Sequence, residues 1–118
     1  MRLDDMGWVY VSGPYTNPDP VVNTHIAIKA GILLRDAGYC PVIPHLSLLV
    51  DMVSPHPPDF YYQWDLCLLH RCDFMLRLPG ESWGADREEE YALQLGIAVH
   101  KMTAEAFITR FWKEKGRK

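Results

Sequence analysis

The stretch from Gly7 to Pro14, GWVYVSGP, is the first element of the predicted fold. It is a short apolar run closed by a glycine and a proline, the pattern of a buried β-strand over residues 7–12. Asp19 and Pro20 follow, and they predict a helix start, because an aspartate caps free N–H groups and proline suits the first helical position. Apolar residues then recur at helical spacing until Gly38 ends the element.

The alternation of apolar runs and helical patterns continues to the end of the chain. The remaining elements are expected to be strands at residues 39–44, 72–78 and 97–101, and helices at residues 59–71 (capped by Asp59), 84–95 and from 104 (capped by Thr103). A proline-rich stretch, residues 45–58, is expected to be a long loop, and such loops are often functional. Alternating strands and helices form a parallel sheet with helices on both faces. The sequence therefore predicts an α/β fold, a three-layer sandwich with a short parallel sheet of four to five strands, in one domain over residues 1–118.

The composition is that of an ordinary globular domain, with 48% hydrophobic and 23% charged residues in 118. A net charge of −3 gives no basic surface of the kind that nucleic-acid-binding proteins carry. The one basic cluster, at residues 113–118, is expected to fray in solvent. We therefore expect no nucleic-acid partner.

Cysteine content and hydropathy bear on where in the cell the protein is located. Three cysteines without CxxC spacing argue against a disulfide framework and against a zinc ribbon. No apolar stretch has the roughly 20 residues that a membrane span needs, and the N-terminal MRLDD lacks the pattern of a signal peptide. These features predict a cytoplasmic protein without a membrane partner.

In a parallel α/β sheet, ligands bind beyond the carboxyl ends of the strands. The segments expected to meet there are residues 12–15, His45, residues 80–84 and residues 102–103. Three consecutive glutamates, Glu88 to Glu90, stand just after the third of these segments, in LPGESWGADREEEYALQLG at residues 78–96. Acidic residues are common near the start of a helix, because the free N–H groups there are positive. The three glutamates are thus either an ordinary helix start or part of a site.

Helical spacing separates the three glutamates. Glu88 lies on the apolar stripe of Ala85, Ala92 and Leu95, so it is expected to face the protein. Glu90 shares its face with Asp86, Arg87 and Gln94 and is expected to point to water, with Glu89 at the boundary. A carboxylate on an apolar face at the ligand end of a sheet favours a functional role for Glu88, the alternative being a satisfied edge glutamate.

Asp65 is a second carboxylate in an unusual setting. It lies within FYYQWDLCLLH, residues 60–70, where aromatic and apolar side chains surround it. A carboxylate there is paired, protonated or functional; alternatively it hydrogen-bonds a nearby tyrosine or tryptophan and serves packing. Two carboxylates in unlike surroundings suit a nucleophile and a general acid, as in retaining glycosidases.

Four segments together resemble the nucleoside 2-deoxyribosyltransferase superfamily. They are YVSGPYT (10–16), GYCPVIPHL (38–46), the YxxxD of Tyr61 and Asp65, and SWGADREEEYA (82–92). The resemblance covers residues 8–99 and is greatest to small members such as the 2'-deoxynucleoside 5'-phosphate N-hydrolases. It implies a flavodoxin-like (Rossmann-like) fold and cleavage of the N-glycosidic bond of a nucleoside or nucleotide. We expect no cofactor and no metal. The family habit of forming dimers and larger assemblies implies a homo-oligomer.

The resemblance also implies roles for particular residues. Glu88, four residues after Gly84 and four before Ala92, matches the family's nucleophile. Asp65 matches the aspartate implicated in proton transfer to the base, and Tyr10 matches a tyrosine of the first strand. The residues expected to bind substrate are Ser12, Gly13, Pro14, Tyr15, His45, Ser82 and Gly84. Glu88 would attack C1' of the sugar while Asp65 protonates the departing base, and the glycosyl-glutamate would then pass to water or to another base.

Ser82 bears on the substrate class. Family members that use unphosphorylated nucleosides carry an aspartate at this position, whereas nucleotide hydrolases carry a serine. A hydroxyl at a helix N-terminus can receive a phosphate, so we expect a nucleoside 5'-monophosphate as the substrate. The alternative interpretation of Ser82 is a plain helix cap. The arginine that some nucleotide hydrolases carry after the first strand is replaced here by Tyr15, Thr16 and Asn17.

Other classes of function remain open. The same fold without turnover would be a nucleotide-binding sensor or partner module. A metal site built from His45, Asp51, His56 and His70 fits no established zinc spacing. A flavin or dinucleotide protein is disfavoured, since no GxGxxG follows the first strand.

Overall fold

The structure is a computed structural model that describes the backbone of residues 6–115 and the side chains of residues 6–111. The N-terminal MRLDD and the side chains of the basic cluster at residues 113–118 lie outside these limits. The elements in chain order are β1 (Trp8–Ser12), α1 (Pro20–Asp36), β2 (Cys40–Val42), a 3-10 turn η2 (Pro44–Leu46), α2 (Ser47–Val53), α3 (Pro58–His70), β3 (Phe74–Arg77), α4 (Trp83–Gln94), β4 (Ala98–Lys101) and α5 (Ala104–Lys115).

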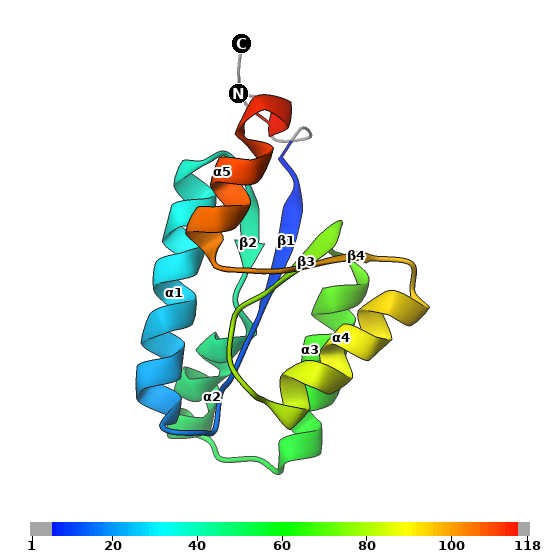
Figure 1. The fold of residues 1–118 in the computed structure, drawn as a ribbon. Coiled ribbons are helices and arrows are strands. Elements are labelled where there is room, and N and C mark those ends of the chain that lie inside the picture. Colours follow the sequence, from blue (N-terminus) through cyan, green and yellow to red (C-terminus); the bar gives the residue numbers. More distant parts are fainter. Residues whose placement is uncertain (1–5, 116–118) are drawn as a thin grey trace.

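The four strands form one parallel sheet in the order β2-β1-β3-β4 (Figure 1). Helices α1 and α5 cover one face, and α3 and α4 cover the other. This arrangement confirms the three-layer α/β sandwich, flavodoxin-like in kind, with four strands. None of the helices in the described part of the chain is both long and apolar enough to cross a membrane.

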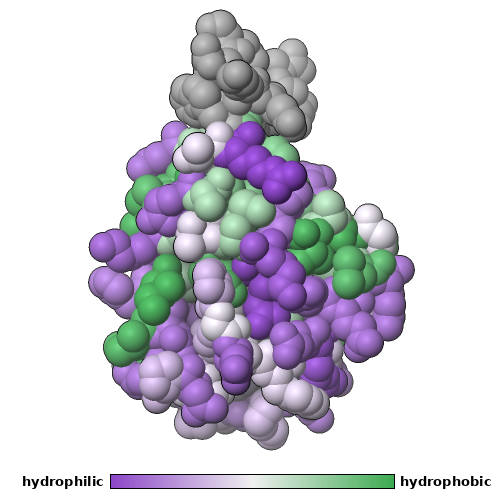
Figure 2. All heavy atoms as spheres, in the orientation of Figure 1, coloured by the Kyte–Doolittle hydropathy of each residue, from purple (hydrophilic) through white to green (hydrophobic). Residues whose placement is uncertain are grey.

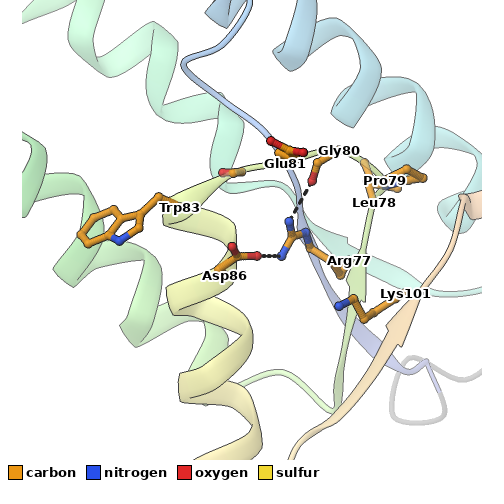
Figure 3. A pocket seen from close by; sticks show the side chains of 9 residues that line it. Arg77, Leu78, Pro79, Gly80, Glu81, Trp83, Asp86 and Lys101 are labelled. Carbon is orange, nitrogen blue, oxygen red and sulfur yellow. Dashed lines mark hydrogen bonds and ion pairs between the residues drawn. The ribbon is translucent and has the colours of Figure 1, made fainter.

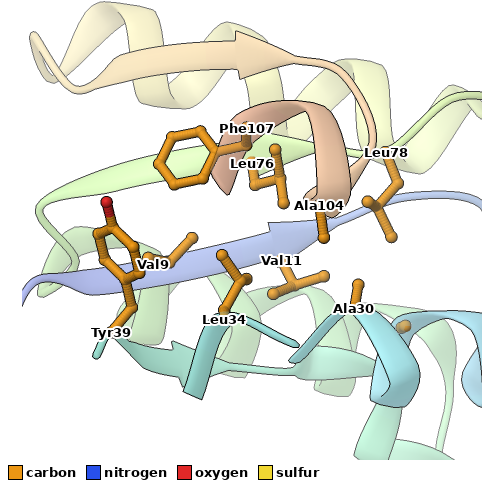
Figure 4. Close-up of a cluster of buried hydrophobic side chains, with 10 residues drawn as sticks. Val9, Val11, Ala30, Leu34, Tyr39, Leu76, Leu78, Ala104 and Phe107 are labelled. Atoms are coloured by element: carbon orange, nitrogen blue, oxygen red, sulfur yellow. The ribbon is translucent and has the colours of Figure 1, made fainter. Parts of the chain in front are cut away.

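Strand β1 runs through the middle of the sheet and supplies both cores. Val9 and Val11 point to one face, where they pack with Leu34 of α1 and Phe107 of α5 (Figure 4). Tyr10 points to the opposite face, with Leu69, Met75 and Ala92. Because side chains alternate along a strand, Ser12 lies on the same face as Tyr10. This alternation places two hydroxyl groups under helix α4.

Three of the predicted helix starts have a side-chain cap. Asp19 accepts a hydrogen bond from the N–H of Val22 at 3.4 Å, and Thr103 accepts one from Ala106 at 3.1 Å, as predicted. Helix α4 begins at Trp83, one residue before the predicted start, because the oxygen of Ser82 caps it by accepting from Ala85 N–H at 3.1 Å.

Two predictions for the middle of the chain are wrong. Residues 45–58 are not one long loop, since they contain η2 and α2. Helix α2 continues directly from the turn that Pro44 begins, and its largely apolar run SLLVDMV has no side-chain cap and no apolar face buried against the core. Asp59 does not cap α3, which begins at Pro58 after Pro57; Asp59 lies in the first turn, where the helix dipole favours an acid.

Candidate active site

The carboxylate of Glu88 is held by two hydroxyl groups of strand β1. The Tyr10 hydroxyl donates to Oε2 of Glu88 at 2.8 Å, and the Ser12 hydroxyl donates to Oε1 at 2.9 Å. Glu88 is only 9% exposed, and Ala85 and Ala92 of its predicted stripe are buried as well, whereas Leu95 is the C-cap residue and is 36% exposed. Each carboxylate oxygen thus has one hydrogen-bond partner, and the carboxylate group has a defined orientation.

These contacts affect the protonation states of Glu88 and Tyr10. Burial raises the pKa of Glu88 above its usual range, while the hydroxyls of Tyr10 and Ser12 and the charge of Arg77 act in the opposite direction. Burial, followed by the charges of Glu88 and Asp65, raises the pKa of Tyr10 well above its usual value, so this phenol stays protonated and remains a donor. Together the two hydroxyls favour an ionised, oriented carboxylate.

Glu88 opens onto a cavity of about 730 Å³ that Asp65 also lines. The loop after β1, the turn after β2, helix α3 and the start of α4 enclose it. It lies beyond the carboxyl ends of β1 and β2, where parallel α/β sheets bind ligands. The two carboxyl groups that the sequence singles out therefore face one shared space.

Asp65 has a different environment from Glu88. Burial, and then the nearby charge of Glu88, raise the pKa of Asp65 to about 8. No residue among 6–111 hydrogen-bonds its side chain, so the tyrosine or tryptophan partner of the packing alternative is not present there. At neutral pH Asp65 is mostly protonated and can donate a proton into the cavity. One carboxyl group is held in a fixed orientation and the other carries a proton, and such a pair can supply a base or nucleophile together with an acid.

The other predicted site residues divide into two groups. The cavity is lined by Gly13, Pro14, Tyr15, His45, Ser82 and Gly84. Tyr10 and Ser12 do not line it, since both are fully buried behind Glu88. The sequence predicts that Ser12 touches the ligand, but the structure places it where it orients the carboxylate instead.

His45 holds the loop that follows β1. Its Nε2 donates to the carbonyl of Pro14 at 2.9 Å, and its ring contacts that of Tyr15 with 5.9 Å between centroids. Burial lowers the pKa of His45, so the ring is neutral. Among the side chains that the structure describes, no group of three or more His, Cys, Asp or Glu is arranged to hold a metal ion.

The neighbour Glu89 belongs to a brace around Arg77, the last residue of β3. Figure 3 shows the contacts of Arg77 with Asp86 and with the carbonyl of Gly80. Arg77 donates to Asp86 at 2.8 Å, to Glu89 at 3.2 Å and to the carbonyl of Gly80 at 2.9 Å, and Lys101 of β4 lies 3.4 Å from Glu89. The brace borders a second hollow of about 540 Å³. It ties α4 to two strands and to the loop before it, and so fixes the helix that carries Glu88.

Arg77→Met is expected to lower the free energy of unfolding by about 2–4 kcal/mol, because Arg77 is buried and the change leaves Glu89 without its inner partner. Lys101→Met is the matched control. The Lys101 side chain is 65% exposed, so losing its pair with Glu89 should cost less than about 1 kcal/mol. Urea unfolding of both variants checks this; equal losses would contradict a brace centred on Arg77.

Arg87 is a cavity residue that helical patterning misses. The pattern assigns Arg87 to the water-facing side with Glu90. Glu90 is exposed as predicted, but Arg87 is half-buried and lines the cavity. Its guanidinium carbon lies 4.0 Å from the ring centroid of Tyr62 and 4.5 Å from that of Trp83. The four-residue spacing of Trp83 and Arg87 on one helix is the signal that indicates this contact.

Comparisons with known proteins bear on the fold. No protein-family model matches the chain, and no curated protein matches it. Among solved structures, the chain is similar to the 2-deoxyribosyltransferase of Bacillus psychrosaccharolyticus, with 20% sequence identity and a TM-score of 0.56 over 79% of this chain and 69% of that chain. At this level of identity the likeness establishes one conclusion, that this chain has the α/β fold of a deoxyribosyltransferase.

Proposed function

We propose that the protein cleaves the N-glycosidic bond of a nucleoside 5'-monophosphate through a covalent glycosyl ester of Glu88. The observation that carries this proposal is the pairing of Glu88, held by two hydroxyls, with a protonated Asp65 in one cavity. The fold shared with a deoxyribosyltransferase, described as a biocatalyst for the synthesis of nucleosides, supports the same class of reaction.

The first step breaks the bond between sugar and base. A carboxylate oxygen of Glu88 forms a bond to C1', the electron pair of the C1'–N bond goes to the base, and Asp65 gives its proton to the base. The transition state carries positive charge on the sugar, which the adjacent carboxylate stabilises. The hydroxyls of Tyr10 and Ser12 keep the attacking group in position throughout.

The second step releases the sugar. The ionised Asp65 takes a proton from water, or from an incoming base, as that nucleophile attacks C1' and the ester bond to Glu88 breaks. Both carboxyl groups then return to their starting states, since the same residue serves as acid and then as base. Water gives hydrolysis, and a second base gives transfer.

The start of α4 is the proposed position of the 5'-phosphate. The oxygen of Ser82 accepts from Ala85 N–H, so its own O–H remains free to donate into the cavity. A Cβ placed on Gly84 would meet no atom within 4 Å, so this end of the helix is open. Free N–H groups and the helix dipole favour an anion there.

We also propose that the protein forms a homo-oligomer. Exposed apolar side chains gather on α1 and on the neighbouring α2, namely Val22, Ile26 and Leu33 on the first and Leu49, Met52 and Val53 on the second. Figure 2 shows hydrophobic side chains along the α1 edge of the face in view, and a second group of them at the opposite edge. Contact with another copy of the chain would remove these side chains from water.

The test is incubation with a panel of ribonucleoside and deoxyribonucleoside 5'-monophosphates and the matching nucleosides, with chromatography of the free base. We expect base release from at least one monophosphate, and a new nucleotide when a second base is present in excess if transfer occurs. Binding of a monophosphate by calorimetry, without release from any member of the panel, would contradict the enzyme and support the sensor or partner module.

A further inference from the structure

We infer that Arg87 receives the 5'-phosphate and thereby decides between nucleoside monophosphates and unphosphorylated nucleosides. This inference rests on the proposed function, because it assigns a substrate group to the same cavity.

The way in which Arg87 is held leaves its hydrogen-bond donors free. The rings of Tyr62 and Trp83 lie within 4.0 and 4.5 Å of its guanidinium carbon, and such contacts engage the face of the group. The N–H donors lie along the edge, in a fork that fits two phosphate oxygens. No carboxylate within residues 6–111 pairs with Arg87, whereas Arg77 has both Asp86 and Glu89. The two aromatic rings therefore hold the cation without neutralising it.

The charge of the cavity makes this cation necessary for an anionic ligand. The carboxyl groups that line the cavity are those of Asp51, Asp59, Glu81 and Glu88, together with that of Asp65, which is mostly protonated at neutral pH. Arg87 is the only lysine or arginine among the described residues that line it; the histidines that line it are His45, which is neutral, and His56. A phosphate dianion entering such a cavity meets repulsion unless a fixed positive charge offsets it. A neutral nucleoside has no such requirement.

The positions of Arg87 and Glu88 on α4 would let the two side chains contact different ends of one substrate. Arg87 and Glu88 are consecutive, and consecutive side chains on a helix point about 100° apart. Glu88 is thus directed to β1 and the anomeric carbon, while Arg87 is directed across the cavity to α3. Gly84, three residues before Arg87 and four before Glu88, and the capping residue Ser82 lie at the start of the same helix and line the same cavity. Arginine, hydroxyl and helix N-terminus together form a receptor for a phosphate.

The experiment compares a monophosphate with its own nucleoside in Arg87→Gln, in Arg87→Lys and in the wild type. Arg87→Gln is expected to lower kcat/KM for the monophosphate by roughly 10- to 100-fold, the range for losing charge-assisted hydrogen bonds. The loss should lie mainly in KM, with the nucleoside changed less than about twofold. Arg87→Lys keeps the charge without the fork and should restore part of the loss.

Arg110→Gln is the matched control, because Arg110 also lies over an aromatic ring, that of Phe111 at 5.4 Å, but does not line the cavity. It should change neither substrate. Thermal unfolding of each variant confirms that the fold is retained. Equal losses for monophosphate and nucleoside in Arg87→Gln would overturn the inference, since they would make Arg87 a support for the aromatic pair or a contact of the base.

Binding measurements separate this inference from the proposed reaction. Calorimetric titration of a deoxynucleoside monophosphate, into wild type and Arg87→Gln, requires no turnover. Binding that depends on Arg87, without base release, would sustain the phosphate site and refute the reaction. Base release that is indifferent to Arg87, or monophosphate binding of equal strength in both proteins, would refute the phosphate site alone.

Discussion

Glu88→Gln is expected to lower the rate of base release by roughly 10⁴-fold or more, because glutamine has no carboxylate to attack C1'. The fold should survive. The amide oxygen of glutamine can still accept from one of the two β1 hydroxyls, and the amide N–H can donate to the other. Steady-state chromatography of the free base, with thermal unfolding of the same samples, measures both effects.

Glu90→Gln is the matched control for this change. Glu90 lies on the same helix but is exposed and has no partner among the described residues, so its replacement should leave the rate within about twofold. Glu89 is a poor control, because it pairs with Arg77 and Lys101. Mass spectrometry of the acid-quenched wild type should also show a protein adduct of one sugar phosphate. Activity that persists in Glu88→Gln would exclude Glu88 as the nucleophile.

Asp65→Asn is expected to lower base release by roughly 10²- to 10⁴-fold, the usual contribution of a general acid. In the wild type, kcat/KM should fall about tenfold per pH unit above pH 8, because the pKa of Asp65 is raised to about 8 and only the protonated form can donate. A rate that stays constant to pH 10, or that falls in the same way in Asp65→Asn, would contradict this role.

The same substitution is expected to make the protein more stable. The pKa of Asp65 is about 8 in the fold against 3.8 in the unfolded chain, so the folded state retains a proton that the unfolded state releases between these values. Stability therefore falls as the pH rises through this window, by at most about 1.4 kcal/mol per unit. Asparagine does not titrate, so Asp65→Asn should unfold at a higher temperature than wild type at pH 8, and the difference should close near pH 4.

Asp59→Asn serves as the control for stability. Asp59 lies on the same helix in an exposed first turn, where negative charge is favourable, so its replacement should give no gain at pH 8. A calorimetric scan at several pH values checks all three proteins. If Asp65→Asn were no more stable than wild type at pH 8, Asp65 would not be the unfavourable buried acid described above.

Local patterns were sufficient for much of the fold. Asp19 and Thr103 precede apolar periodicity, and each caps the helix that the pattern predicts, because capping depends on residues only three apart. The inward position of Glu88 follows from helical spacing with Ala85 and Ala92 for the same reason. The pattern places this carboxylate inside the protein, but it cannot identify what the carboxylate contacts.

The contacts that give Glu88 its properties depend on the tertiary structure. Ser12 lies 76 residues from Glu88 in sequence, so only the packing of α4 over β1 reveals that Ser12 orients the carboxylate instead of contacting a ligand. Helix α2 was missed because its run of apolar residues has no buried face that would produce a periodic pattern. Helical spacing alone predicts that Arg87 is a surface residue, because its contact with Tyr62 comes from another helix.

The central strand has a consequence for redesign of the protein. Val9 and Val11 of β1 anchor the strand in one core, while Tyr10 and Ser12 hold the carboxylate of Glu88 on the other face. The connections at residues 13–17 and 44–53, by contrast, shape the opening of the cavity and contribute nothing to that grip. In the proposed reaction the attacking carboxylate is held by the sheet and not by the loops, so changes in these connections should alter which molecules enter before they alter the contacts of Glu88.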